Sequence, residues 1–284
     1  MKKSIDNVTP DFTTQFSILM SVYGKDDPKF FRTAVESVLN QTVRPTEIIL
    51  VVDGPVPVGL GREIANLCSE FNLIRPIELE KNGGLGNALR IGMTEASNEI
   101  VARMDSDDIA HPDRFAKQLA FLKSNPEIDI VGGQIEEFIN SPDNIVGKRE
   151  VPLSNKETKN WLRKRCPFNH MTVMMRKSKV IGVGNYIDWH YNEDYYLWIR
   201  MAEAGCNFAN LPDTLVSVRV GKEMYQRRGG WKYFKSEKKL QDYMLSHGII
   251  SFPQYCFNTL IRFGVQVAIP NKVRGFIFQK LFRK

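Results

Sequence analysis

A cluster of carboxylates follows a short apolar stretch near the middle of the chain. Residues 99–104 have the composition of a buried strand in which Arg103 is the exception, and Asp105-Ser106-Asp107-Asp108 comes directly after it. Three carboxylates within four residues repel one another unless a cation lies among them. A turn that caps the next helix is the alternative, but a cap needs only one carboxylate. The pattern therefore favours a site for a metal ion and a diphosphate.

A second acidic pair, Glu193-Asp194, falls in the first turn of a helix expected within residues 189–205. Carboxylates at this position complement the helix dipole, which is the simpler interpretation. The sharper one is that Asp194 is a general base, because a carboxylate held near another anionic cluster can have a raised pKa.

Three further polar signals are weaker. His170 lies at the mouth of a strand expected within residues 169–176, where a lone histidine is either structural or catalytic. Arg227 and Arg228 precede two glycines and suit either contact with a phosphate or a solvated surface. Residues 81–86 form a glycine-rich turn whose amides could approach a ligand at a helix N-terminus, although it lacks the dinucleotide G-x-G-x-x-G spacing.

The elements that must position these groups alternate along the first half of the chain. Strands are predicted at residues 16–23, 47–53, 72–79 and 99–104, separated by helices at 28–41 and 61–71 and by one that ends near 96. This alternation predicts a parallel, doubly wound sheet whose strand ends share one edge. Asp53 would lie at that edge, as a ligand of a base or ribose or as a turn residue.

The second half is predicted to be mixed. Helices are expected at 114–124, at 154–165 with a capping box from Ser154 to Glu157, and at 231–247. Residues 128–139 predict one strand, or two with a break at Gly132-Gly133, and residues 207–218 are extended. From residue 252 onward, apolar and basic side chains interleave, which fits a helix in a membrane interface or one packed on the globular domain.

Composition and charge restrict the function classes. The net charge of +7 is uneven, because residues 219–284 hold 14 Lys/Arg against 3 Asp/Glu. Such a basic region could meet phospholipid or nucleic acid. The four cysteines form no C-x-x-C pair, which fits a reducing cytoplasm, and no secretory signal or spanning segment of about 18 apolar residues is apparent.

The order of these motifs resembles glycosyltransferase family 2, inverting enzymes of the GT-A fold that use nucleotide-diphosphate sugars. The resemblance covers residues 15 to 220. The motifs that carry it are Val22-Tyr23, residues 34–42, Asp53-Gly54, residues 82–90, Asp105 to Asp108 and residues 192–198. The C-terminal part resembles bacterial members that build O-antigen, capsule or exopolysaccharide units on lipid carriers.

The resemblance implies an α/β fold of the GT-A, Rossmann-like type: a mostly parallel central sheet flanked by helices, with a helical C-terminal region. Residues 1–14 would be a tail and 15–220 the catalytic domain, with 15–110 binding the nucleotide and 111–220 the acceptor. Residues 221–284 would be a basic helical region that contacts a membrane surface.

The resemblance also implies a role for each motif residue. Asp194 would be the base, with Glu193 as its neighbour, and Asp107 would bind Mn2+ or Mg2+. The residues expected to contact the nucleotide sugar are Val22, Tyr23, Asp53, Gly83, Asn87, Arg90, Asp105, Ser106, His170, Arg227 and Arg228. Many relatives have two adjacent aspartates where this chain has Val52-Asp53. The Gln-x-x-Arg-Trp signature of processive synthases is missing in that form, which favours a single addition.

The expected activity is transfer of a hexose, with galactose or glucose favoured, from a UDP-sugar to a saccharide on an undecaprenyl-diphosphate type lipid. The enzyme would be cytoplasmic and peripheral on the inner face of the cell membrane. A nucleotidyltransferase is the alternative, but Gly24-Lys25-Asp26-Asp27 does not supply its glycine-rich basic turn. A nucleic-acid binder is disfavoured because the aspartates would repel a phosphate backbone.

Overall fold

The computed structural model describes residues 15–221 and 229–268. The expected N-terminal tail, Arg227, Arg228 and the basic end of the chain lie outside these residues. Within them, nine strands form one sheet in the order β3-β2-β1-β4-β8-β6-β9-β5, with β7 paired to β6.

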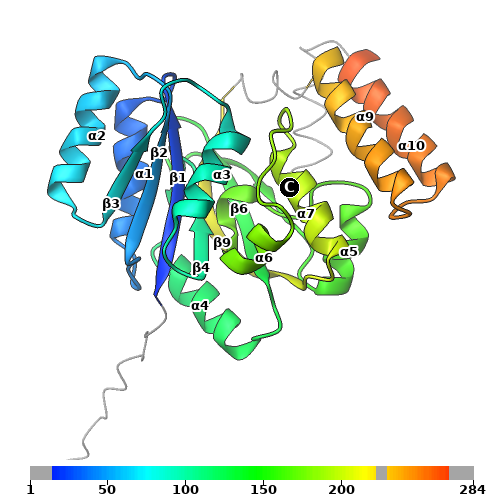
Figure 1. Ribbon diagram of the computed structural model, residues 1–284, viewed down its shortest axis with the longest axis horizontal. Coiled ribbons are helices and arrows are strands. Elements are labelled where there is room, and N and C mark those ends of the chain that lie inside the picture. Colours follow the sequence, from blue (N-terminus) through cyan, green and yellow to red (C-terminus); the bar gives the residue numbers. More distant parts are fainter. Residues whose placement is uncertain (1–14, 222–228, 269–284) are drawn as a thin grey trace, which may run out of the picture.

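Four parallel strands form the first half of the sheet. They are β1 (Phe16–Tyr23), β2 (Glu47–Asp53), β3 (Ile74–Glu78) and β4 (Ile100–Arg103). Successive side chains of β1 and β2 enter different cores, because α1 (Pro28–Leu39) and α2 (Val58–Glu70) cover one face and α3 (Leu85–Glu95) the other. Both faces are therefore buried, which explains the nearly continuous apolar runs (Figure 1).

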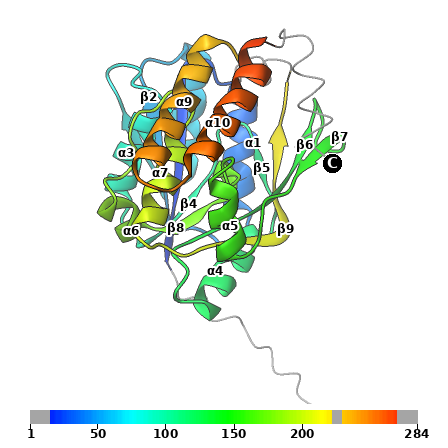
Figure 2. The same cartoon turned by 90° about the vertical axis from the view of Figure 1, so that its right-hand side faces the viewer.

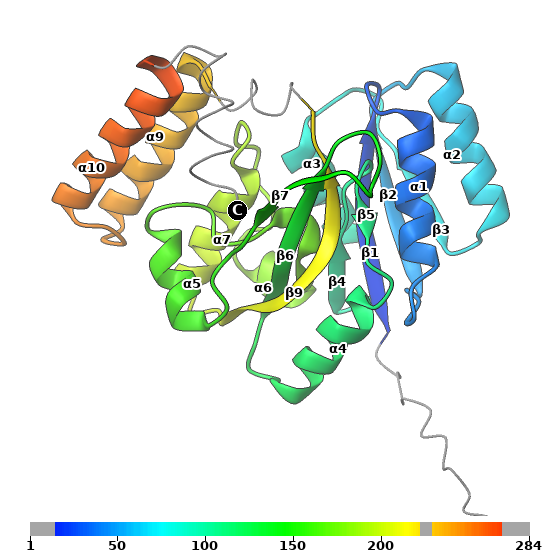
Figure 3. The same ribbon diagram turned by 180° about the vertical axis from the view of Figure 1, so that it is seen from behind.

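The second half of the sheet is mixed. β6 (Ile130–Phe138) runs parallel to β9 (Phe208–Arg219), whereas β8 (Met174–Arg176), β7 (Ile145–Arg149) and β5 (Ile109–Ala110) pair antiparallel (Figure 3). The α/β sheet flanked by helices is confirmed. Parallel pairing, however, is limited to β3-β2-β1-β4 and β6-β9. In this half, only β4–β5 and β6–β7 are joined without a helix, and β6 and β7 form an antiparallel hairpin.

The structure decides two local points that the sequence left open. β6 is one strand, the first of the two alternatives; Gly132 and Gly133 lie inside it, leave room for Asn210 and Leu215 of β9, and mark a shift in its register with β9. The strand expected within residues 169–176 occupies Met174–Arg176, after a 3₁₀ turn at His170–Thr172. The side chain of Asn169 donates to the carbonyl of Gly133 at 2.8 Å.

Most of the remaining helices follow the predictions closely. They are α4 (Arg114–Ser124), α5 (Asn155–Leu162) with its Ser154–Glu157 capping box, α7 (Glu193–Glu203), α9 (Trp231–Ser246) and α10 (Phe252–Phe263), the last followed by a π-helical turn at Gly264–Ala268. A further short helix, α6 (Lys177–Gly182), was not predicted. α9 and α10 lie side by side: Figure 1 has them at the right-hand end of the molecule, and Figure 2 shows that end turned toward the viewer. None of the described helices has both the length and the apolar character that crossing a bilayer requires.

Because α3 packs closely on the sheet at Gly92, we expect a single added methyl group there to lower the stability of the protein. A Cβ at Gly92 would come within 2.3 Å of the Leu19 side chain and 2.9 Å of that of Val51. We expect Gly92→Ala to lower the free energy of unfolding by about 1–3 kcal/mol, because the helix or the strands must shift. Urea denaturation measures the change. Gly61→Ala in α2 is the control, since its Cβ would meet only Val56 at 3.6 Å and helix propensity favours alanine by up to about 1 kcal/mol.

Candidate active site

The ends of β1 and β2 bring two predicted residues together. Val22 pairs with Val52 and Tyr23 with Asp53 in the parallel register, so Tyr23 and Asp53 lie side by side at the carboxyl edge of the sheet. Asp53 is buried, and its carboxylate accepts hydrogen bonds from the amides of Gly83 at 2.7 Å and Gly84 at 3.0 Å. Asp53 therefore fixes the glycine turn, and its predicted contact with a nucleoside stays a prediction.

The glycine turn leads into α3 and holds the next predicted residues. Gly84, at φ +84°, precedes the helix. The side chain of Asn87 lies so close to Gly83 that a Cβ there would come within 2.5 Å of Asn87 Nδ2, and Arg90 Nη2 donates to Asn87 Oδ1 at 2.8 Å. Gly83, Asn87 and Arg90 thus form one connected group at the start of α3.

The segment after β4 separates its carboxylates into different environments. Ser106 Oγ donates to Asp26 Oδ2 at 2.9 Å, and the amide of Tyr23 donates to the same oxygen at 3.1 Å. Asp108 is buried and accepts from the backbone amide of Arg219 at 2.9 Å. Asp107 is exposed. Asp108 therefore has a structural role, and Asp107 is available to a ligand.

The electrostatics of this segment suit a cation. Partial desolvation by the surrounding protein and the negative charges of Asp105 and Asp26 raise the pKa of Asp107 to about 6, and solvent contact at this exposed side chain weakens these effects. Within residues 15–221 and 229–268, no group of three His, Cys, Asp or Glu side chains is placed to hold a metal ion. Mg2+ is often bound through one or two carboxylates together with substrate phosphates. The residues thus fit a cation that shares its ligands with a diphosphate.

Arg103 lies between the two acidic groups of the site. Its side chain is 1 % exposed and forms an ion pair with Asp105. Burial by itself lowers the pKa of Arg103, but Asp105 and Asp108 keep it raised, so the side chain is a cation. Burial raises the pKa of both Glu193 and Asp194, and the charge of Arg103 partly opposes that rise. In the sequence, Arg103 stands out only as a charged residue in an otherwise apolar strand. Because charged side chains are rarely buried without a partner, this position was the available indication that Arg103 has a special role.

Glu193 and Asp194 occupy the first turn of α7, as predicted. Glu193 is buried against α3, where a Cβ at Gly86 would lie 3.2 Å from Glu193 Cβ. Burial and Asp194 raise the pKa of Glu193 to about 8. Asp194 accepts from the amide of Tyr195 at 2.7 Å and from Cys166 Sγ at 3.5 Å, and burial raises its pKa. This pair can exchange protons near neutral pH.

The amino-acid sequence of the chain also matches a known protein family. Residues 17–183 match the family described as Glycosyl transferase family 2. The chain belongs to glycosyltransferase family 2. The match includes the Asp53, Asp105 and His170 motifs and ends before Glu193.

Relatives of this glycosyltransferase align over nearly its whole length. It is 42% identical to an uncharacterized glycosyltransferase of Haemophilus influenzae, over 95% of this chain and 100% of the relative. It is 39% identical to the amylovoran biosynthesis glycosyltransferase AmsE of Erwinia amylovora, over 93% and 98%. It is 37% identical to a UDP-Gal:alpha-D-GlcNAc-diphosphoundecaprenol beta-1,3-galactosyltransferase of Escherichia coli, over 96% and 98%.

The fold is that of solved glycosyltransferases. The structure of S. aureus TarS 1-349 in complex with UDP-GlcNAc superposes with a TM-score of 0.66 at 16% identity, over 88% of this chain and 73% of TarS 1-349. At this identity the likeness concerns the fold alone, and it confirms the predicted GT-A type.

His170 lies beside the acidic groups of the glycosyltransferase. Its Nε2 is 3.0 Å from the hydroxyl of Tyr186, and its ring packs edge-on against Trp198. Burial, helped by the charge of Arg103, lowers the pKa of His170 well below its usual range. A neutral imidazole can orient a hydroxyl but supplies no charge for a phosphate.

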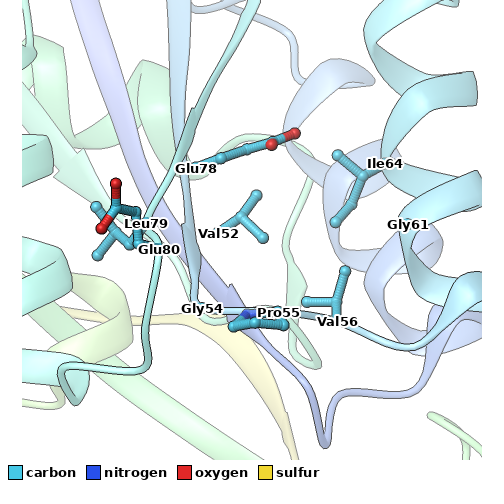
Figure 4. Close-up of a pocket in the computed structure, with 9 residues that line it drawn as sticks. All are labelled: Val52, Gly54, Pro55, Val56, Gly61, Ile64, Glu78, Leu79 and Glu80. Atoms are coloured by element: carbon cyan, nitrogen blue, oxygen red, sulfur yellow. The ribbon is translucent and has the colours of Figure 1, made fainter.

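A hollow of about 290 Å³ lies behind the Asp53 turn, between β2 and α2. Figure 4 shows its wall of Val52, Pro55, Val56 and Ile64 with the carboxylates of Glu78 and Glu80. Those two charges would repel a diphosphate. The hollow is therefore unsuited to a diphosphate.

Proposed function

We propose that this glycosyltransferase transfers a hexose, galactose or glucose, from a UDP-sugar to a saccharide on an undecaprenyl-diphosphate type lipid, with inversion at the anomeric carbon. The product would be a unit of O-antigen, capsule or exopolysaccharide. Two relatives support this proposal by their names, one an amylovoran biosynthesis enzyme and the other a galactosyltransferase acting on GlcNAc-diphosphoundecaprenol. Both align with more than nine-tenths of this chain.

The observation that carries the proposal is the meeting of two acidic groups around Arg103. Asp105 forms an ion pair with Arg103. Burial raises the pKa of Glu193 and Asp194 at the start of α7, and the nearby guanidinium of Arg103 partly offsets that rise. One group suits the diphosphate of a donor with its cation, and the other suits the hydroxyl of an acceptor. A single displacement needs these two functions and no covalent intermediate.

Each residue then has a definite task. Asp107 would hold Mn2+ or Mg2+, which when bound would stabilise the negative charge of the departing diphosphate. Asp105, oriented by Arg103, and Tyr23 with Asp53 would position the nucleoside. Asp194 would accept the proton of the acceptor hydroxyl. Arg227 or Arg228, both outside the described residues, would contact the diphosphate.

We also propose a division of labour along the chain. Residues 15–110 would bind the nucleotide and residues 111–220 the acceptor, while residues 221–284 would contact the inner face of the cytoplasmic membrane. A lipid-linked acceptor is confined to that surface, so a peripheral enzyme would meet it there.

Transfer assays test the proposal. We expect one of UDP-galactose and UDP-glucose to be consumed with a GlcNAc-diphospho-lipid acceptor and Mn2+ or Mg2+. Asp107→Ala should lose at least about 100-fold in kcat/KM, because a carboxylate that stabilises leaving-group charge is removed. Asp113→Ala is the control, since Asp113 is a partly exposed carboxylate paired with Lys117 at 2.8 Å. Consumption of no UDP-sugar under any of these conditions would refute the proposed function.

A further inference from the structure

The last described helix has its apolar side turned outward. Phe252, Phe257 and Leu260 of α10 are 65%, 64% and 70% exposed, and Ile261 and Phe263 are also exposed. Trp231, at the start of α9, extends this surface, because its ring lies 5.8 Å from that of Phe263. We call these six residues the outer apolar face.

The opposite side of α10 is polar and fastens the helix to the protein. Asn258 Nδ2 donates to the carbonyl of Arg163 at 2.9 Å and to Gln241 Oε1 at 2.8 Å. Arg262 forms an ion pair with Glu237 and donates to the carbonyl of Lys164 at 2.7 Å. These carbonyls follow the last turn of α5, where backbone acceptors lack helical partners. The helix is thus oriented by specific hydrogen bonds, and the orientation is opposite to that of an ordinary surface helix.

Among the described residues, no element packs on the outer apolar face. We propose that this face inserts into the surface of an anionic phospholipid bilayer and so places the active site at the membrane. This proposal rests on the proposed function, because an acceptor linked to a lipid would be found in a bilayer.

Charge favours a bilayer over another protein surface. Residues 252–284 contain six Lys/Arg and no Asp or Glu. Two copies of this chain, each carrying this basic segment, would repel each other electrostatically, whereas anionic lipid headgroups would attract the segment. Apolar residues flanked by cations are the composition of helices that lie in a membrane interface.

The fold connects this face to the candidate base. Ser236 of α9 accepts from Asn192 Nδ2 at 3.1 Å and donates to the carbonyl of His190 at 2.7 Å, and its own carbonyl accepts from Trp189 Nε1 at 3.2 Å. Asn192 directly precedes Glu193 and Asp194. A bilayer bound to α10 would therefore stand at a fixed position relative to the acceptor side of the active site.

Sedimentation of the full-length protein with vesicles tests the proposal without any UDP-sugar. Vesicles of phosphatidylglycerol and phosphatidylethanolamine should bind the wild type, and phosphatidylcholine vesicles should bind it more weakly. The double variant Phe257→Ser/Leu260→Ser should lower the partition coefficient at least about tenfold at high salt, where the contribution of the basic residues is screened. Val58→Ser is the matched control, because Val58 is 77% exposed on α2, at the opposite end of the molecule (Figure 1).

Other occupants of the face give different results. If residues 269–284 of the same chain cover it, the double variant will melt at a lower temperature. If a second copy covers it, the wild type will be a dimer in light scattering and the variant a monomer. Either result, or equal vesicle binding by wild type and double variant, would overturn the proposal.

The two proposals can fail separately. Vesicle binding with no consumption of UDP-sugars would reject the proposed function alone. Normal transfer to a water-soluble acceptor analogue by wild type and double variant, with no vesicle binding, would reject the membrane surface alone.

Discussion

Asp194→Asn is expected to lower kcat by roughly 10²–10⁴-fold, because the amide cannot take the proton of the acceptor hydroxyl. The side chain has two fixed donors, the amide of Tyr195 and the thiol of Cys166, which hold the carboxylate in place at the start of α7. The affinity for the UDP-sugar should change by less than about threefold, since binding of the donor makes no use of this base. Transfer kinetics combined with donor titration separate the two effects.

Glu193→Gln is the matched variant and distinguishes the two acids of the pair. If Asp194 is the base, Glu193→Gln should retain much more activity than Asp194→Asn. The reverse order of activities would assign the base to Glu193. Equal and small losses in both variants would exclude general-base catalysis by this pair.

Stability should show the cost of burying Glu193. Its pKa is raised from 4.5 to about 8, so the folded state binds the proton more tightly than the unfolded state. Wild-type stability should therefore decrease as pH rises from about 5 to 8, because Glu193 ionises in water in the unfolded state while the folded state keeps it protonated. Glu193→Gln should remove this decrease and be more stable than the wild type by up to about 4 kcal/mol at pH 8, as measured by urea denaturation at several pH values.

Arg103→Met is expected to be the most damaging substitution outside the groups that contact substrate. Methionine fills a similar volume, but Asp105 and the buried Asp108 would lose their central cation. We expect a loss of about 3–5 kcal/mol in the free energy of unfolding. We also expect kcat/KM to reach its plateau at higher pH, because the charge of Arg103 lowers the pKa of Glu193 and Asp194 in the wild type.

Arg103→Lys keeps the test informative if the methionine variant fails to fold. Lysine retains the charge, so the pH profile should stay near that of the wild type, while the ion pair with Asp105 is weakened. A wild-type pH profile in Arg103→Met would show that Arg103 is structural only. If Arg103→Lys has an unchanged metal requirement but a raised KM for the UDP-sugar, then Arg103 acts by orienting Asp105.

The amino-acid sequence determined the local elements and the family. α4 has the predicted bounds, the Ser154–Glu157 capping box is present, and the strands that end at Tyr23, Asp53 and Arg103 lie where the apolar runs placed them. Such features depend on neighbours a few residues away, so the sequence carries them directly. The order of short motifs was likewise sufficient to indicate glycosyltransferase family 2.

Only the tertiary structure shows which residues that are distant in the sequence contact one another. The antiparallel pairing of β8, the burial of Asp108 beside the exposed Asp107, the ion pair of Arg103 with Asp105 and the outward face of α10 all depend on contacts between distant residues. Amphipathic spacing in α10 predicted a helix with two faces, but it could not tell which face meets the protein. That choice came from acceptors at the end of α5, which only folding brings beside Asn258 and Arg262.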